Sequence, residues 1–408
     1  MSFLLHFNFT TAHIICTIPG YYGSFSMRLT LFYGFAIFAM FFGSGNIIFP
    51  LQIGVLSGGD WLFGAFGLLI TGVLLPFLGM FAVKMHRGSY ESFFGEGGEL
   101  AKKILPLVTL SLLGSIGVVP RCITVAHGAI KYAFPDVSLF VFSTVFCILM
   151  FLFCTKERWL LSVLGKWMSP ILFLLLISVI FVGVMKEGDM VFPKMPSEAF
   201  NQGFVIGYHT MDLLAAFFFS TLIFNQIKES IPPLASSKEI IKIAIFPMLC
   251  GATILSLVYI GLVFLGAKYA YIVRYVAPEF LLVTVVNNLL PNYSKIVVGV
   301  IITLSCLTTA VALNSIYARY LCLISRSENN FYSILFLTTF VSFIFSQMNF
   351  SGISYFLNPV LEMIYPNLIV LTMLSILMHG KYYHFKKIVF YISILNTFLQ
   401  HSKILSLT

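Results

Sequence analysis

One stretch of the sequence combines residues that break a helix with residues that can bind ions. Gly43, Ser44 and Gly45 lie inside a long apolar run, with Asn46 next and Pro50 soon after. Glycine is a poor helix former and proline lacks a backbone donor, so this pattern predicts an interrupted helix. Carbonyl groups exposed at such a break can coordinate a cation, and the new helix N-terminus can hold a carboxylate. We favour this interpretation over close packing of small residues between helices.

A second polar stretch interrupts another apolar run. It comprises Gly203, Gly207, Tyr208, His209, Thr210, Met211 and Asp212. A carboxylate is unfavourable inside a membrane, so Asp212 should face a cavity or a partner. It could be a cation ligand, a proton carrier or a polar contact between helices. Interruptions at corresponding places in two halves of a chain are the best sequence indication of a transporter site.

Two further apolar runs carry embedded polar groups. Ser305, Thr308 and Thr309 offer oxygen ligands for a small alkali cation, although threonine in a membrane helix more often bonds its own backbone. Arg121 lies in another run, with His127 further along it. For Arg121 we favour a structural ion pair over a contact with substrate.

Membrane-spanning helices must position these residues. Of the 408 residues, 59% are hydrophobic and only 10% are charged, and the mean hydropathy is +0.98. A soluble domain cannot hide so much apolar surface. A bilayer core about 30 Å thick takes roughly 20 apolar residues per helical span. The apolar runs are long and continuous rather than alternating, which favours helices over a β-barrel.

Eleven apolar runs qualify as spans. They are 29–50, 62–84, 104–130, 138–155, 163–185, 201–227, 241–266, 293–322, 331–347, 353–379 and 386–405. If the first span starts in the cytoplasm, the cytoplasmic loops hold more than twice as many Lys and Arg residues as the outer loops. This bias sets orientation, and it accounts for the net charge of +9 without nucleic acid as a partner.

Two long loops indicate an internal repeat. Residues 85–103 follow the second span and residues 267–292 follow the seventh, so a long loop recurs after five spans on the opposite face. A repeat of five spans must invert its topology, and inverted repeats are typical of transporters.

These observations predict the organisation of the chain. A five-plus-five core over 27–380 comprises a first repeat (27–185) and an inverted second repeat (201–380), and 381–408 adds a C-terminal helix. Residues 1–26 lack the features of a signal peptide and are interpreted as an N-terminal extension or, alternatively, a membrane-surface segment.

Other classes of function lack their motifs. The seven cysteines sit singly, without the spacing of a metal or redox site. The HExxH, P-loop and GxSxG motifs are absent from the sequence, which argues against an enzyme. No repeated ligands suggest a channel filter. We therefore expect no cofactor beyond a coupling ion, and the oligomeric state stays open.

Motifs along the chain resemble those of the bacterial branched-chain amino acid:cation symporters. In order they are Phe-Gly-Ser-Gly-Asn-Ile-Ile-Phe-Pro (42–50), Leu-Leu-Ile-Thr-Gly-Val-Leu-Leu-Pro (68–76), Pro120-Arg121 with Thr124-Val125, Gly-Tyr-His-Thr-Met-Asp (207–212), Cys-Leu-Thr-Thr-Ala (306–310) and Tyr365-Pro366. The resemblance runs from about residue 29 to 380, across ten spans. It implies the inverted five-plus-five fold of LeuT-like transporters. It also implies sodium-coupled uptake of leucine, isoleucine and valine across the bacterial cytoplasmic membrane.

The resemblance implies two sets of site residues. Sodium would bind the carbonyls of Ala39, Phe42 and Ser305 and the hydroxyls of Thr308 and Thr309. The amino acid would lie against Gly43, Ser44, Gly45, Asn46, Tyr208, His209, Thr210 and Met211. Asp212 and Arg121 are candidate coupling or polar residues.

The sequence departs from the family pattern in two places. After Arg121 the family usually continues Thr-Ala-Thr-Val-Ser-Phe-Glu, whereas this chain reads Cys-Ile-Thr-Val-Ala-His-Gly (122–128), without the acidic residue. Family members often have twelve spans, and eleven are expected here. The alternatives are a proton-coupled transporter of another small amino acid, using Asp212 and His209, or a LeuT-fold sensor that does not transport.

Overall fold

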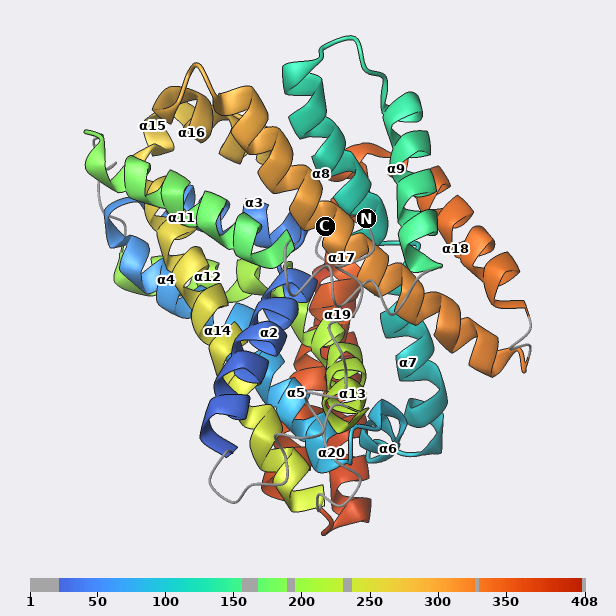
Figure 1. Ribbon diagram of the computed structural model, residues 1–408. Coiled ribbons are helices and arrows are strands. Elements are labelled where there is room, and N and C mark those ends of the chain that lie inside the picture. Colours follow the sequence, from blue (N-terminus) through green and yellow to red (C-terminus); the bar gives the residue numbers. More distant parts are fainter. Residues whose placement is uncertain (1–21, 156–167, 189–194, 230–236, 327–329, 406–408) are drawn as a thin grey trace.

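Every regular element in the described part of the chain is a helix (Figure 1). The structure is a computed structural model and describes residues 22–155, 168–188, 195–229, 237–326 and 330–405. Helices are the expected outcome, because a membrane segment satisfies its backbone polar groups only from within itself. The predicted all-α fold class is confirmed.

The helices follow the predicted apolar runs. The first half contains α2 (Tyr22–Phe41), α3 (Ser44–Ser57), η1 (Gly58–Asp60), α4 (Trp61–Leu69), the π-helical turn η2 (Ile70–Leu74), α5 (Leu75–Met85), α6 (Tyr90–Gly95), α7 (Glu99–Leu113), α8 (Val118–Ala133), α9 (Leu139–Cys154) and α11 (Ser169–Met185). The second half contains α12 (Pro196–Tyr208), α13 (Asp212–Glu229), α14 (Ser237–Lys268), α15 (Ala270–Val273), η4 (Pro278–Phe280), α16 (Leu281–Leu289), α17 (Ser294–Ile324), α18 (Phe331–Ser346), α19 (Asn349–Leu377) and α20 (Tyr383–Leu405).

Several of these helices suit a lipid environment. Five helical segments are long and apolar enough to cross a membrane, and the bent pair α12–α13 makes a sixth. Four shorter apolar helices accompany them among the described residues. Large apolar side chains point outward, such as Ile148 on α9, Leu174 on α11 and Phe336 on α18. Such an apolar exterior indicates a membrane protein, while the count of eleven spans stays a prediction.

Helix α14 lies along both α2 and α3 because glycines allow their backbones to meet. A β-carbon at Gly266 would lie 2.1 Å from the carbonyl oxygen of Leu51, and one at Gly54 would lie 2.0 Å from that of Val263. Small residues at such crossings are typical of membrane helix packing. Both halves of the first predicted span are therefore supported by one long helix.

Helix α12 approaches α4 in the same way. A β-carbon at Gly203 would lie 2.0 Å from the carbonyl oxygen of Gly64, and one at Gly207 would lie 1.9 Å from the hydroxyl of Thr71. Thr71 lies in η2, and π-helical turns are frequent at functional sites. The first half of the sixth predicted span is thus fixed against the second span.

The third predicted span, 104–130, is not one helix. α7 ends at Leu113 and α8 begins at Val118. A β-carbon at Gly117 would lie 2.1 Å from the carbonyl oxygen of Leu112, so glycine is needed in this turn. The hydroxyl of Ser115, inside the turn, donates to the carbonyl of Thr338 on α18 at 2.7 Å. One candidate membrane span, Glu99–Ala133, covers both helices. The predicted third span is therefore present, as two helices with a turn that long-range packing stabilises.

The two predicted long loops lie at opposite ends of the molecule. The segment 85–103 contains α6 and the start of α7, and the segment 267–292 contains α15, η4 and α16. Figure 1 shows α6 near the bottom and α15 and α16 at the upper left. α2 begins at Tyr22, and residues 1–21 of the predicted extension lie outside the described residues. The repeat boundaries and the orientation in the membrane stay predictions.

Candidate functional site

The first predicted break is present. α2 ends at Phe41 and α3 begins at Ser44. The amide of Gly43 donates to the carbonyl of Phe41 at 2.7 Å. Because Gly43 precedes a new helix, the first amides of α3 have no partner within their own helix, and the positive end of its dipole faces the break.

The second predicted break is also present. α12 ends at Tyr208 and α13 begins at Asp212, and the two helices are bent by 48°. Met211 has a φ of 63°, in the left-handed region that side chains rarely adopt. The hydroxyl of Thr210 donates to the carbonyl of Gly207 at 2.9 Å and satisfies one carbonyl at the end of α12.

A buried hydrogen-bonded group joins the two breaks. Asn46 Nδ2 donates to Asp212 Oδ2 at 2.7 Å, and the Tyr259 hydroxyl on α14 donates to the same oxygen at 2.8 Å. Asn46 Nδ2 also contacts the Tyr259 hydroxyl. Asp212 and Asn46 are each 2% exposed. Asp212 therefore has the polar partners that its place in a membrane demands.

Hydroxyls of α17 converge on the carbonyls at the end of α2. Ser305 Oγ donates to Phe42 O at 2.5 Å. Thr308 Oγ1 lies 2.9 Å from Ser305 O and 3.4 Å from Ala39 O. Thr309 Oγ1 lies 3.3 Å from both Ala39 O and Met40 O. The structure thus brings together all five predicted cation ligands, and it adds the Ser305 hydroxyl and the Met40 carbonyl.

Arg121 on α8 is buried beside both breaks, and it does not form the ion pair favoured from the sequence. Its Nη1 lies 3.3 Å from the carbonyl of His209 and 3.6 Å from Met211 Sδ. Within the part of the chain that the structure describes, no carboxylate lies within 4.0 Å of the guanidinium, and its Nε and Nη2 have no hydrogen-bond partner. His127 instead contacts the carbonyl of Val137 at 2.9 Å.

A small cavity lies between the breaks. Its volume is about 10 Å³, which is enough for about one water molecule. Its lining includes Gly43, Ser44, Gly45, Asn46, Arg121, Thr210, Met211, Asp212 and Thr309. Six of the eight residues predicted to contact substrate line it, and Tyr208 and His209 do not. The Tyr208 ring packs on Tyr365 at 5.0 Å, and the His209 ring lies 5.7 Å from that of Phe49.

Besides Met40, sequence reasoning missed Tyr259 and Cys122. Tyr259 bonds Asp212, yet it is one aromatic residue in an apolar run and only its hydroxyl at mid-span could have signalled a role. Cys122 Sγ lies 3.6 Å from Ser44 Oγ. Its position directly after Arg121 in the sequence was the available signal.

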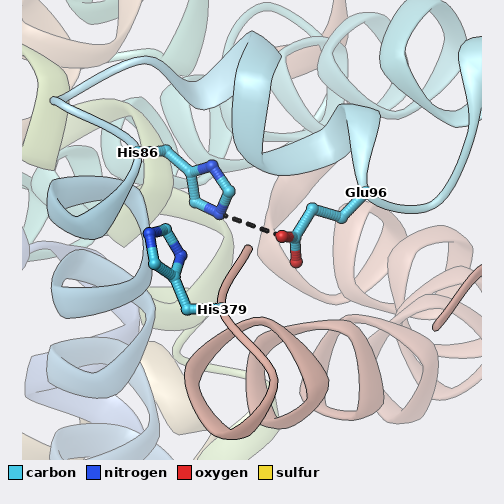
Figure 2. Close-up of side chains that lie close together, drawn as sticks. All are labelled: His86, Glu96 and His379. Atoms are coloured by element: carbon cyan, nitrogen blue, oxygen red, sulfur yellow. Dashed lines mark ion pairs between the residues drawn. The ribbon is translucent and has the colours of Figure 1, made fainter. Parts of the chain in front are cut away.

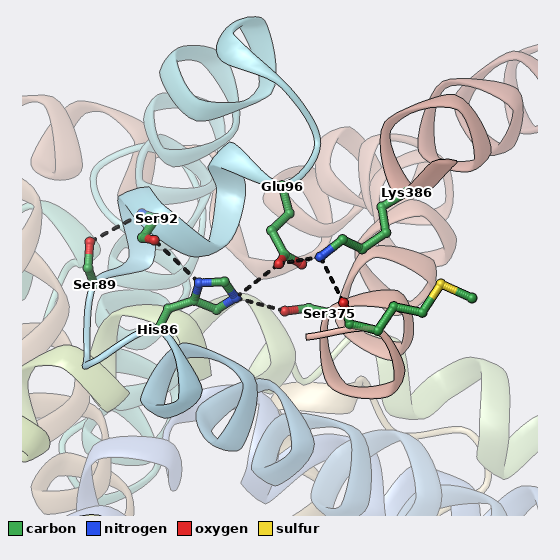
Figure 3. Close-up of polar contacts among 7 residues, drawn as sticks. His86, Ser89, Ser92, Glu96, Ser375 and Lys386 are labelled. Carbon is green, nitrogen blue, oxygen red and sulfur yellow. Dashed lines mark hydrogen bonds and ion pairs between the residues drawn. The ribbon is translucent and has the colours of Figure 1, made fainter. Parts of the chain in front are cut away.

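A second polar cluster lies near α6, α19 and α20. His86, Glu96 and His379 each offer a ligand atom within 4.8 Å of the others (Figure 2). Lys386 Nζ lies 2.5 Å from Glu96 Oε1, and His86 Nε2 lies 3.0 Å from Ser375 Oγ (Figure 3). Because the Lys386 ammonium group already pairs with the Glu96 carboxylate, the arrangement favours an ion-pair network over a metal site. We call His86, Glu96, Ser375 and Lys386 the His86 network.

Known proteins resemble this chain over nearly its whole length. The family described as branched-chain amino acid transport protein matches residues 26–405. The branched-chain amino acid transport system 3 carrier protein of Pseudomonas aeruginosa is 32% identical over 349 residues, covering 84% of this chain and 79% of that protein. The branched-chain amino acid permease BrnQ of Haemophilus influenzae is 31% identical over 379 residues, covering 86% and 82%.

Solved structures support the fold. Mhp1, a nucleobase-cation-symport-1 family transporter in a closed conformation with bromovinylhydantoin bound, has a TM-score of 0.58 at 18% identity and covers 84% of this chain and 77% of its own. A manganese transporter of Eremococcus coleocola has a TM-score of 0.51 at 11% identity, covering 94% and 87%. These similarities show the predicted LeuT-like fold, while the family match and the named relatives show the function. The chain therefore belongs to the branched-chain amino acid transport protein family, and it is a membrane transporter of branched-chain amino acids rather than an enzyme.

Proposed function

We propose that this transporter couples sodium entry to the uptake of leucine, isoleucine and valine across the bacterial cytoplasmic membrane by alternating access. The observation that carries the proposal is the convergence of the α17 hydroxyls on the carbonyls that end α2. Three carbonyls and two threonine hydroxyls form an all-oxygen ligand set, which suits a hard cation. The sodium ligands would be Ala39, Phe42, Ser305, Thr308 and Thr309.

Two of the oxygen–oxygen distances at this site support a cation of sodium's size. Thr308 Oγ1 and Thr309 Oγ1 lie 3.4 and 3.3 Å from Ala39 O, longer than an ordinary hydroxyl hydrogen bond of about 2.5–3.0 Å. Na⁺ is close in size to Ca²⁺, whose oxygen ligands lie at about 2.3–2.6 Å, so ligands at right angles would be roughly 3.3–3.7 Å apart. These two distances to Ala39 O are thus nearer to ligand–ligand spacing than to direct hydrogen bonding, whereas Thr308 Oγ1 lies at hydrogen-bonding distance, 2.9 Å, from Ser305 O.

The proposed cycle uses the break as the link between ion and substrate. Sodium binds from outside and orders the end of α2, and the amino acid then docks against Gly43–Asn46 and Thr210–Met211. The cavity of about 10 Å³ is too small for leucine, so the site must open to load. The membrane potential contributes about 2.3 kcal/mol per charge per 100 mV.

Proton coupling is the second candidate, and one observation favours it. Asp212 is a buried carboxylate that lines the cavity and bonds both Asn46 and Tyr259. A carboxylate in this position can carry a proton through a transport cycle. The Asp212→Asn variant retains the shape of the side chain without the charge. Uptake that is driven by a proton gradient and lost in this variant would support proton coupling.

The test uses purified protein in liposomes. We would measure uptake of labelled isoleucine with and without an inward sodium gradient at fixed pH, for wild type and for Thr308→Ala/Thr309→Ala. Thr144→Ala is a matched control, because Thr144 bonds its own helix at 2.8 Å on the exposed face of α9. Stimulation by sodium that is lost in the double variant and kept in the control is the expected result. Uptake by wild type that is indifferent to sodium would overturn sodium coupling.

A further inference from the structure

Arg121 is a buried cation without an anionic partner. It is 2% exposed, and within the described residues its hydrogen-bond contacts are a carbonyl and a thioether, both through Nη1. Two of its nitrogen atoms, Nε and Nη2, have no hydrogen-bond partner. Buried charges in proteins are normally paired. In the described part of the chain the guanidinium therefore retains donors for a ligand that is not part of the protein.

Aromatic rings hold the guanidinium without neutralising it. Its central carbon lies 5.0 Å from the ring centre of Phe49 on α3 and 5.4 Å from that of Phe350 on α19. Cation–π contacts of this kind stabilise a cation and fix its position. They leave the donors at the edge of the guanidinium plane free to bind an anion in a bidentate manner.

The unpaired Nη2 points to the start of α3. A β-carbon built on Gly45 would lie only 3.2 Å from Nη2. Gly45 is the second residue of α3, a helix of 14 residues. The first amides of a helix lack partners within it, and its dipole favours an anion there. Two independent sources of positive potential, a helix N-terminus and a guanidinium, therefore meet beside one cavity.

We propose that Arg121, which lies beside the first amides of α3, itself binds the carboxylate of the transported amino acid and determines the preference for substrates that carry one. This inference rests on the proposed uptake of amino acids and deepens it. Asp212 lines the same cavity and carries the opposite charge, so a zwitterion fits with its carboxylate toward Arg121. Arg121 is then a specificity-determining residue, because an amine that lacks the carboxylate leaves the guanidinium unpaired.

The competing explanation is that Arg121 has a purely structural role. Arg121 connects α8 to the second break through the His209 carbonyl. If that is its only role, removing Arg121 would weaken the binding of all ligands to the same extent. Leucine and L-leucinol distinguish the two roles, because they share the ammonium group and the side chain and differ in the carboxylate. If Arg121 binds the carboxylate, its removal should abolish the preference for leucine. If its role is structural, its removal should reduce the affinity for both ligands equally.

The test measures dissociation constants of leucine and L-leucinol for purified wild type, Arg121→Gln and Arg121→Lys. Wild type should prefer leucine by about 10- to 100-fold, as expected for hydrogen bonds to a charged group. Arg121→Gln should reduce this ratio to about threefold or less, and Arg121→Lys should retain part of it. Lys84→Gln is the matched control: Lys84 is also buried, at 1% exposed, with Nζ unpartnered, but it does not line the cavity.

Wild type that binds leucinol as tightly as leucine would overturn the inference even if Arg121→Gln fails to fold. So would an Arg121→Gln protein that keeps the wild-type ratio. Gly45→Ala provides a second variant, since its methyl group crowds Nη2 and should weaken leucine more than leucinol. Uptake of isoleucine by wild type is measured in parallel. Its absence would overturn the proposed function, whereas uptake with an unchanged ratio in Arg121→Gln would overturn only the carboxylate subsite.

Discussion

At the scale of single residues, Gly43 and Thr309 lie so close together that a methyl group does not fit between them. A β-carbon on Gly43 would lie 2.9 Å from Thr309 Cγ2 and 3.1 Å from its hydroxyl oxygen. The glycine that breaks the helix is thus also the residue that lets α17 bring a hydroxyl to the end of α2. Close packing of small residues is thus present at this break, and it is compatible with the proposed ion site.

We therefore predict that Gly43→Ala displaces Thr309 and weakens sodium binding. The sodium concentration that gives half-maximal uptake should rise about tenfold, equivalent to about 1.4 kcal/mol. The measurement is isoleucine uptake across a sodium titration. Gly299→Ala on the same helix α17 is the control, because nothing lies within 4 Å of a β-carbon there. A sodium dependence that is the same in Gly43→Ala and wild type would contradict the prediction.

At the scale of elements, different contacts hold the two interrupted helices in place. The first break is supported along its whole length by α14, which meets α2 at Gly34 and α3 at Gly54. α12, before the second break, is fixed by α4, and α13 begins with Asp212, which accepts hydrogen bonds from α3 and α14. Since α14 contacts both halves of the first break and also bonds Asp212, its position decides the geometry of the whole site.

Gly266→Ala should disturb this position. Its β-carbon would lie 2.1 Å from a backbone carbonyl of α3, so α14 and α3 must separate. Overpacking of this kind costs about 1–3 kcal/mol. We expect a lower midpoint of thermal unfolding and slower isoleucine uptake. Gly128→Ala on α8 serves as control, because its nearest neighbour would be 3.6 Å away. Equal unfolding midpoints for the two variants would rule out a close α14–α3 contact.

At the scale of the whole molecule, the helix packing follows the predicted five-span shift. The first span packs on the seventh, through α2, α3 and α14, and the sixth packs on the second, through α12, α13, α4 and α5. Exchanging each span for the one five positions away converts one pair into the other. The third and eighth spans meet each other through α8 and α17. This packing is the pattern that a five-span repeat would produce, while the repeat and its inversion stay predictions.

Local features of the site were predictable, and long-range contacts were not. Glycine and proline act on their own backbone, so the breaks at Gly43 and before Asp212 could be predicted from the sequence. For Thr308, the sequence alone favoured a structural role, because threonine in a membrane helix often bonds its own backbone, and the family resemblance is what makes it a proposed sodium ligand. The bond between Tyr259 and Asp212 joins residues 47 positions apart, and helical periodicity carries no information about such partners.

The pair Glu96–Lys386 connects the segment after α5 to the C-terminal helix α20. Both side chains are buried, at 9% and 2% exposed. Removing one partner of a buried ion pair costs about 3–5 kcal/mol, while replacing both costs less. We predict a large fall in the unfolding midpoint for Lys386→Met and a partial recovery in Glu96→Gln/Lys386→Met. Additive losses in this double-mutant cycle would show that the pair contributes no coupling.

The His86 network should also make stability depend on pH. Burial lowers the pKa of His86, and His379 and Lys386 act in the same direction, against an opposing effect of Glu96. The other polar neighbours of its ring, Ser92 Oγ at 3.3 Å and Ser375 Oγ at 3.0 Å, carry no charge. The folded protein therefore binds fewer protons at this site than the unfolded chain, whose histidine pKa is about 6.5. The folded protein is therefore most stable, as far as His86 is concerned, above a pH of about 6.5. It loses stability as the pH falls below this value, because the unfolded chain then binds a proton more readily than the folded protein does.

We predict that the midpoint of thermal unfolding falls more steeply between about pH 7.5 and pH 5.5 in wild type than in His86→Gln. The amide of glutamine can replace hydrogen bonds of the ring but does not titrate. His384→Gln is the control, because His384 is exposed at the start of α20 and its removal should leave the wild-type slope. The same slope in wild type and His86→Gln would show that His86 does not control the pH response. A rise in the wild-type midpoint on acidification would reverse the sign and show that Glu96, rather than burial, dominates at this histidine.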